Sequence, residues 1–141
     1  MRPSYLLDTG PLVAYLHQRE EHHYWAKSTL STLMRPLLTC ESVLSEACFL
    51  LEGSPVGVNA VLDLVSRGAL EIPFRLTDEC DSVARLMRRY ATVPMSLADA
   101  CLVRMAEQIS GSVVVTLDGD FAIYRKNGRQ VIPTMMPPAR R

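Results

Sequence analysis

This sequence lacks long apolar runs, and it has no excess of charge of either sign. No segment approaches the ~18 consecutive apolar residues of a membrane span, so we expect no contact with a membrane. Its 15 acidic and 15 basic residues cancel. No overall field therefore attracts nucleic acid, and any such contact depends on local patches. The first residues also lack the apolar region and cleavage site of a signal peptide, which indicates a protein of the cytoplasm.

Cysteine patterns typical of metal fingers or disulfide scaffolds are also missing. The four cysteines are Cys40, Cys48, Cys80 and Cys101. None stands in a C-x-x-C pair or has a histidine at finger spacing, and three of them fall within apolar-periodic segments. We therefore expect four free thiols, most of them buried.

Repeats, low-complexity segments and linkers rich in proline or glycine are absent before the last seven residues, MMPPARR. A chain of 141 residues can bury roughly two-thirds of the surface that its unfolded form exposes, which suits one hydrophobic core. We expect a single domain over residues 1–134 and a flexible tail over residues 135–141.

The sequence does contain a regular alternation of short apolar runs and amphipathic helical segments. The pattern predicts strands over residues 5–7, 36–39, 70–74, 112–116 and 130–132. It predicts helices over residues 11–17, 21–34, 41–52, 55–67, 77–90 and 96–109. Strands separated by helices form parallel crossovers, so we expect a three-layer α/β/α sandwich with a mainly parallel sheet of about five strands.

Five acidic residues fall where such a sheet would bring them together. Asp8 follows the first strand, and Asp118 and Asp120 follow the fourth. Glu46 lies in the second turn of the helix after the second strand, and Asp99 lies in the first turn of the last long helix. The carboxyl ends of parallel strands and the amino ends of the following helices share one sheet edge, where open α/β sheets place their sites. We expect these carboxylates to converge there.

Each of these acids also has an ordinary structural explanation. Asp8 and Asp118 are typical turn residues, and Asp99 follows Ser96 at the spacing of a capping box. Glu46 is harder to explain in this way. Its neighbours at helical spacing include a phenylalanine and a leucine, so its carboxylate borders an apolar face and needs a partner if it is buried.

Carboxylates crowded at one edge repel one another unless a cation or protons offset the charge. Oxygen ligands without a nearby histidine or cysteine favour Mg²⁺ or Mn²⁺ over zinc. Such ions bind phosphate groups, lower the pKa of an attacking water and neutralise charge in the transition state, with one or two ions in the site. The class of chemistry indicated is phosphate-ester hydrolysis.

Four segments together resemble the PIN domain family, and within it the VapC-like toxins of bacterial toxin–antitoxin pairs. They are LLDTGPLVAYL, SEACFLL, SLADACLVRMAE and VVVTLDGDF, and the resemblance extends over nearly the whole chain. It implies the strand order 3-2-1-4-5 and a Mg²⁺- or Mn²⁺-dependent ribonuclease that cleaves single-stranded RNA. It also implies inhibition by a cognate antitoxin and a homodimer.

The resemblance also implies roles for individual residues. The catalytic acids of the family match Asp8, Glu46, Asp99 and Asp118. The metal ligands match Asp8, Asp99, Asp118 and Asp120, where Asp120 binds either directly or through water. Thr9 and Thr116 match polar residues that support the site.

Basic residues near the later acids are candidates for contacts with RNA. They are Arg85, Arg88, Arg89, Arg125 and Lys126, and Arg140 and Arg141 follow in the tail. This distribution could guide a phosphate backbone. A solvated helix face is the alternative, and the zero net charge favours that alternative.

Two other functions remain to be weighed. The triplet Asp8-Thr9-Gly10 is also the signature of aspartic proteases, but those enzymes are rich in β-structure, whereas here the triplet leads into a helix at Pro11. The second alternative is a non-catalytic PIN-like module that binds RNA or protein without cleaving RNA. The presence of all the acids argues against it.

Overall fold

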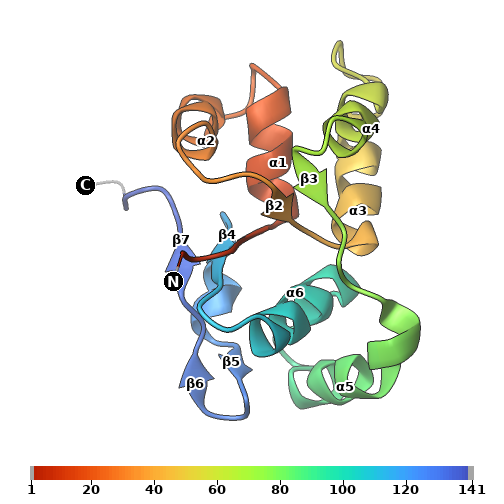
Figure 1. Ribbon diagram of the computed structural model, residues 1–141, viewed down its shortest axis with the longest axis vertical. Helices are drawn as coiled ribbons and strands as arrows, with labels where there is room; N and C mark the ends of the chain where they lie inside the picture. The colour runs from red at the N-terminus through yellow and green to blue at the C-terminus, as the bar shows by residue number, and fades with distance from the viewer. Residues whose placement is uncertain (1, 140–141) are drawn as a thin grey trace.

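The computed structural model describes residues 2–139 and contains a five-stranded parallel sheet (Figure 1). The strands follow the order β3-β2-β1-β4-β7, and every neighbouring pair is parallel. Their bounds are Tyr5–Leu7 for β1, Leu37–Leu38 for β2, Leu70–Glu71 for β3, Val113–Val115 for β4 and Thr134–Met135 for β7. The predicted α/β sandwich with a parallel sheet of about five strands is confirmed.

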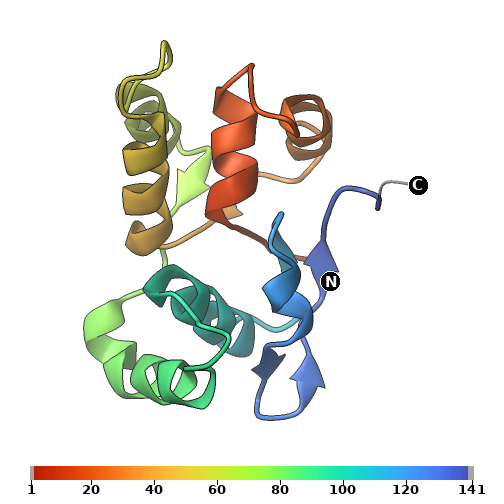
Figure 2. The ribbon, with the colours of Figure 1, turned by 180° about the vertical axis from the view of Figure 1, so that it is seen from behind.

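Helices connect the strands as crossovers. Their bounds are Thr9–Leu16 for α1, His23–Leu30 for α2, Glu41–Leu51 for α3, Asn59–Ser66 for α4, Leu76–Arg89 for α5 and Leu97–Gln108 for α6. A 3-10 helix, η1, spans Gly119–Ala122. The opposite views in Figures 1 and 2 show α1 to α4 gathered at one end of the molecule and α5 and α6 at the other.

The predicted fifth strand, residues 130–132, forms a strand over its first two residues, but this strand does not join the five-stranded sheet. Gln130–Val131 forms β6, which pairs antiparallel with β5, Arg125–Lys126, in a separate hairpin. Asn127 and Gly128 turn the chain with φ values of 51° and 82°, and Asn-Gly favours this tight hairpin turn because both residues tolerate positive φ. The fifth strand of the sheet is instead β7.

The predicted boundary between domain and tail differs in one respect from the structure. Met135, the first residue of the predicted tail, lies in β7 and pairs with Val115. The division into a domain of residues 1–134 and a flexible tail otherwise stays a prediction. Arg140 and Arg141 lie outside the described residues.

The predicted helix over residues 55–67 begins later than expected. Ser54 and Pro55 lie in a loop, and α4 starts at Asn59. Gly57 has a φ of 72°, which a right-handed helix cannot include, and its N–H donates to Ser54 Oγ at 3.3 Å. The Ser-Pro pair therefore starts a turn rather than the helix.

The core lies where the two central strands meet α6. Leu6 and Leu7 of β1 and Val114 and Val115 of β4 are at most 1% exposed, and α6 is buried along most of its length. Leu7 is paired with Val115, so the residues that follow both strands emerge side by side. The four cysteines are free, and no helix within residues 2–139 has the length and apolarity to cross a membrane.

Candidate active site

Asp8 lies at the junction of β1 and α1 and is held there by two hydrogen bonds. Its Oδ1 accepts the Thr9 N–H at 2.8 Å, so the side chain caps the first turn of α1. Its Oδ2 accepts the Thr116 hydroxyl at 2.7 Å. Because Thr116 directly follows β4, the pairing of the two central strands sets the position of this carboxylate. The helix that begins at Thr9 also rules out the strand context of an aspartic protease.

The surroundings of Asp8 oppose its ionisation. The residue is 6% exposed, and its burial raises its pKa to about 6, although hydrogen bonds from Thr116 and Thr9 lower it. The nearby charges of Asp99 and Asp118 raise it further. A buried carboxyl group among other carboxylates is costly to ionise unless a cation is close by.

Asp118 and Asp120 are positioned by the turn after β4. Thr116 Oγ1 accepts the Asp118 N–H at 2.9 Å, and Asp118 Oδ1 accepts the Asp120 N–H at 2.9 Å, which caps η1. Thr116 therefore links the acids after β1 to those after β4. Its role as a supporting residue of the site stays a prediction.

Asp99 is fixed at the start of α6 by three hydrogen bonds. It forms the expected capping box with Ser96, in which Ser96 Oγ accepts the Asp99 N–H at 3.0 Å and Asp99 Oδ2 accepts the Ser96 N–H at 3.4 Å. The Tyr124 hydroxyl also donates to Oδ2, at 2.9 Å. Burial raises the pKa of Asp99, and the charge of Asp118 adds to this effect. The capping box and the site therefore use the same carboxylate.

Glu46 reaches the site from α3, but it is exposed rather than buried. Its Oε2 accepts the Thr9 hydroxyl at 2.9 Å. The apolar residues beside it, Phe49 and Leu50, are 74% and 56% exposed. Glu46 therefore borders an apolar face of α3, as expected, but no part of the chain in residues 2–139 covers Phe49 and Leu50 on that face.

One open cleft brings together all five predicted acids. Its lining consists of Asp8, Thr9, Gly10, Glu46, Leu50, Pro94, Ser96, Asp99, Leu117, Asp118 and Asp120. A Cβ atom at Gly10 would lie 3.1 Å from Leu117 Cδ1, so glycine lets the start of α1 approach the turn after β4 closely. The predicted convergence of carboxylates at the carboxyl edge of the sheet is therefore present.

The charges of this cleft have no cationic partner. Among residues 2–139, no lysine, arginine or histidine forms an ion pair with any of the five acids, and none lines the cleft. The side chains are nevertheless not arranged as a finished metal site, since no three Asp, Glu, His or Cys side chains in that range converge tightly enough. An oxygen-only, uncompensated donor set fits a divalent cation that retains water ligands.

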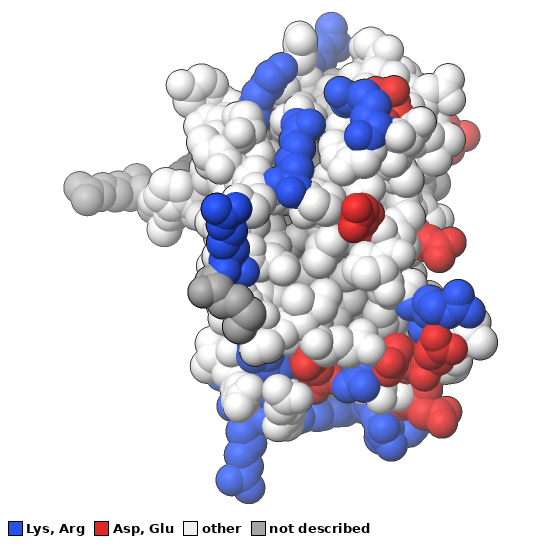
Figure 3. All heavy atoms as spheres, in the orientation of Figure 1, with Lys and Arg blue, Asp and Glu red and all other residues white. Residues whose placement is uncertain are grey.

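The basic residues predicted to contact RNA lie outside this cleft. Arg85 and Arg89 line a second cleft between α5, α6 and the β5–β6 hairpin. Arg89 Nη2 donates to the Gly128 carbonyl at 2.8 Å, and Arg125 Nη1 donates to the carbonyls of residues 122–124. Figure 3 shows acidic and basic side chains interspersed at this end of the molecule. The structure does not bring these cations to the acids.

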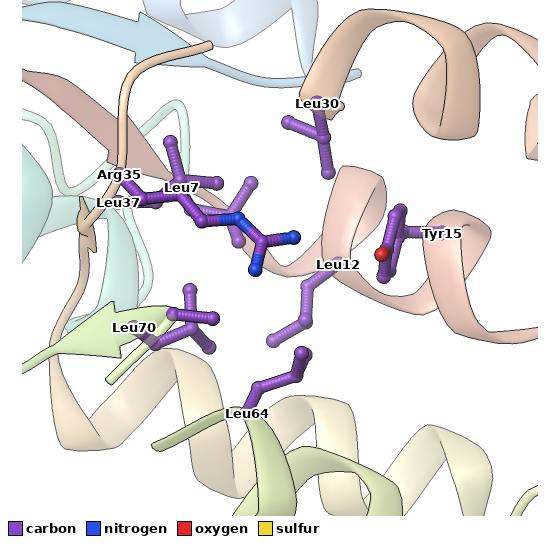
Figure 4. A pocket seen from close by; sticks show the side chains of 9 residues that line it. Leu7, Leu12, Tyr15, Leu30, Arg35, Leu37, Leu64 and Leu70 are labelled. Atoms are coloured by element: carbon purple, nitrogen blue, oxygen red, sulfur yellow. The ribbon is translucent and has the colours of Figure 1, made fainter. Parts of the chain in front are cut away.

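A further pocket, between α1, α2, α4 and strands β2 and β3, has a different character. It is lined by leucines together with Tyr15, Ala69 and Arg35, whose guanidinium group lies over the apolar side chains (Figure 4). It contains no carboxylate or nucleophile, so it is not a candidate active site.

Sequence reasoning missed Tyr124. The side chain is fully buried, and burial together with the Asp99 carboxylate raises its pKa. The phenol therefore keeps its proton and acts as a donor to Asp99. No sequence signal indicates this contact, because the two residues lie 25 positions apart and meet only once the turn after β4 is folded.

Comparisons with known proteins agree with the fold. The model of the PIN domain family matches residues 5–127, and the chain therefore belongs to this family. Ribonuclease VapC26 of Mycobacterium tuberculosis is 28% identical over 116 residues, which cover 80% of this chain and 85% of that protein. The crystal structure of VapC20 of Mycobacterium tuberculosis, a sarcin–ricin loop cleaving toxin, is similar with a TM-score of 0.73. Its identity is 20%, over 85% of this chain and 94% of that one, and this likeness shows the fold.

Proposed function

We propose that this protein is a metal-dependent endoribonuclease that hydrolyses phosphodiester bonds of single-stranded RNA, and that it is the toxin of a toxin–antitoxin pair. The observation that carries the proposal is the cleft of five carboxylates with no cationic side chain among its lining residues. Membership of the PIN family and the likeness to a ribonuclease support it.

The carboxylates suit Mg²⁺ or Mn²⁺, with Asp8, Asp99 and Asp118 as ligands and Asp120 as a direct or water-mediated one. A bound divalent cation would lower the pKa of the attacking water and neutralise charge on the phosphate. The chain itself supplies the positioning, since the Thr116 hydroxyl holds Asp8. Glu46 uses only Oε2 to accept from Thr9, which leaves Oε1 for a proton from the attacking water.

The open shape of the cleft suits a single strand whose backbone can bend toward the acids. We propose that Arg85, Arg88, Arg89, Arg125 and Lys126 contribute to binding the RNA backbone away from the cleavage point.

The uncovered apolar surface beside the cleft suits a protein partner. Phe49 and Leu50 on α3 and Leu97 on α6 are exposed, and exposed apolar patches commonly mark interaction sites. We assign this surface to the homodimer and propose a cognate antitoxin as the inhibitor of the enzyme in the cytoplasm.

Cleavage of a labelled single-stranded RNA tests the proposed activity. We expect products with Mn²⁺ or Mg²⁺, none with EDTA, and none with Asp8→Asn. Asp63→Asn is a matched control, since Asp63 is an exposed partner of Arg67 on α4 and lies outside the cleft. RNA binding without metal-dependent cleavage by the wild-type protein would instead identify a non-catalytic module.

A further inference from the structure

The hydrogen bond from Tyr124 divides the two oxygens of Asp99 between different tasks. Oδ2 accepts the Tyr124 hydroxyl at 2.9 Å and the Ser96 N–H at 3.4 Å. In the described part of the chain, residues 2–139, no group donates a hydrogen bond to Oδ1. This oxygen is accessible rather than fully buried, because it is absent from the buried side-chain atoms without a partner. Because Asp99 lines the acidic cleft, its free oxygen is the one available there.

Tyr124 is itself held firmly. Its ring packs edge-on against Phe121 at 5.2 Å and against Tyr90 at 5.1 Å between ring centroids. The Tyr90 hydroxyl accepts the Arg125 N–H at 2.9 Å, which ties the ring cluster to the backbone next to Tyr124. The side chain is 0% exposed, so neither water nor rotation of the ring competes with the bond to Asp99.

We propose that Tyr124 is a positioning residue that holds Asp99 in the orientation in which Oδ1 faces the cleft, and that it thereby increases the affinity of the site for a divalent cation. This inference rests on the proposed function. Hydrogen-bond partners of metal ligands commonly have this effect, because they fix the ligand before the ion arrives.

The chain offers a closely matched control. Tyr90 belongs to the same ring cluster, is similarly buried and also uses its hydroxyl in one hydrogen bond, but its partner is a backbone N–H rather than a carboxylate. Tyr124→Phe and Tyr90→Phe each remove one buried hydroxyl and keep the ring. Only Tyr124→Phe removes a hydrogen bond to Asp99.

The test is the affinity of the full chain for Mn²⁺ without RNA, measured by calorimetric titration, with thermal melts in EDTA to verify folding. We expect Tyr124→Phe to weaken Mn²⁺ binding about 10-fold and Tyr90→Phe to leave it unchanged. In cleavage assays, Tyr124→Phe should need more Mn²⁺ for half-maximal rate, with most of the rate restored at saturating Mn²⁺. In an Asp99→Asn background, Tyr124→Phe should have no further effect on Mn²⁺ affinity.

Different failures have different meanings. If the wild type binds Mn²⁺ and Tyr124→Phe binds it with equal affinity, the inference is overturned and the proposed function stays intact. Equal losses in the two phenylalanine variants also overturn it, since they show a general effect of the ring cluster. A wild-type protein that binds no Mn²⁺ overturns the proposed function and the inference together.

Discussion

The acidic cleft and the cleft between α5, α6 and the hairpin differ in how their charges are compensated. In the acidic cleft, five carboxylates of one sign share one surface, and they have no ion-pair partner within residues 2–139. In the cleft between α5, α6 and the hairpin, which Arg85, Arg89, Arg104 and Glu107 line, charges of both signs are present and some of them are paired within the chain. Arg104 pairs with Glu79 at 2.9 Å and with Glu107 at 3.3 Å.

The hydrogen bonds of the two clefts differ in the same way. Around the acids, the donors are uncharged groups, and within residues 2–139 they leave some carboxylate oxygens without a donor. These donors belong to Thr9, Ser96, Thr116, Asp120 and Tyr124. In the second cleft, Glu107 accepts the Asn127 N–H at 2.7 Å and Arg89 donates to the Gly128 carbonyl. These bonds fasten the hairpin to the two helices.

The difference teaches that the number of charged residues does not identify a binding site. A cluster that satisfies its own charges gains little from a ligand, whereas uncompensated carboxylates gain from a cation because binding removes their repulsion. The charge of the acidic cleft therefore suits the proposed cation, whereas the hydrogen bonds of the second cleft hold the hairpin against the helices.

The largest expected effect is a loss of RNA cleavage when a carboxylate of the acidic cleft is replaced by its amide. The same replacement in the second cleft is the comparison. Asp118→Asn should lower the rate of RNA cleavage at least about 10³-fold, which corresponds to ~4 kcal/mol of transition-state stabilisation, because it removes a ligand charge. Glu107→Gln should leave the rate within about twofold, since it lies outside the acidic cleft. Initial rates at saturating Mn²⁺ measure both. Comparable losses in the two variants would contradict the division between the clefts.

Much of the fold could be predicted because local patterns and packing agree. The β-branched run of β4 lies between two neighbouring strands of the sheet. The segments with helical periodicity between the strands predict parallel crossovers. Asp8 and Asp118 could be placed together because both follow central strands, and the sheet alone decides that proximity. The acids of the cleft therefore followed from topology.

Other features depend on contacts that no local pattern contains. Gln130–Ile132 has the composition of a strand, but the Asn127-Gly128 turn pairs it with β5 instead of the sheet. Glu46 lies beside apolar residues on α3, yet helical period alone does not show whether a neighbouring element covers that face. The Tyr124 contact with Asp99 requires both the turn after β4 and α6 to be in place.

A smaller effect is expected in the stability of the metal-free protein. The pKa of Asp8 is raised from 3.8 to about 6 in the folded state, so the folded protein binds more protons than the unfolded chain between these values. The free energy of unfolding should therefore fall as the pH rises from about 4 to 7, by about 3 kcal/mol at most from this group. Burial raises the pKa of Asp99 in the same direction.

Asp8→Asn should flatten this pH dependence and raise the stability at pH 7 relative to the wild type. Urea unfolding in EDTA at several pH values measures the free energy of unfolding of both proteins. Asp63→Asn is the control, because Asp63 is exposed and paired with Arg67. If the wild type and Asp8→Asn show the same slope, ionisation of Asp8 is not a cost to the fold.

The smallest expected effect concerns RNA binding by α5, and it separates two roles of the arginines on this helix. Arg85 and Arg88 are exposed on this helix, whereas Arg89 is tied to Gly128. Replacing Arg85 and Arg88 by alanine together should weaken binding of single-stranded RNA a few-fold and reduce the salt dependence of log K by about 1.4, or ~0.7 for each phosphate contact. Arg89→Ala should mainly lower stability, by about 1 kcal/mol for the lost hydrogen bond.

Binding in EDTA over a range of salt concentrations, with thermal melts of the same variants, measures both effects. Arg67→Ala is the control, since its guanidinium group pairs with Asp63 on α4, which lies at the opposite end of the molecule from α5 (Figure 1). An unchanged salt dependence in the Arg85/Arg88 double variant would show that this helix face is only solvated. Binding of the RNA backbone would then depend on the proposed contacts outside this helix, Arg125 and Lys126, and on the acidic cleft with a bound cation.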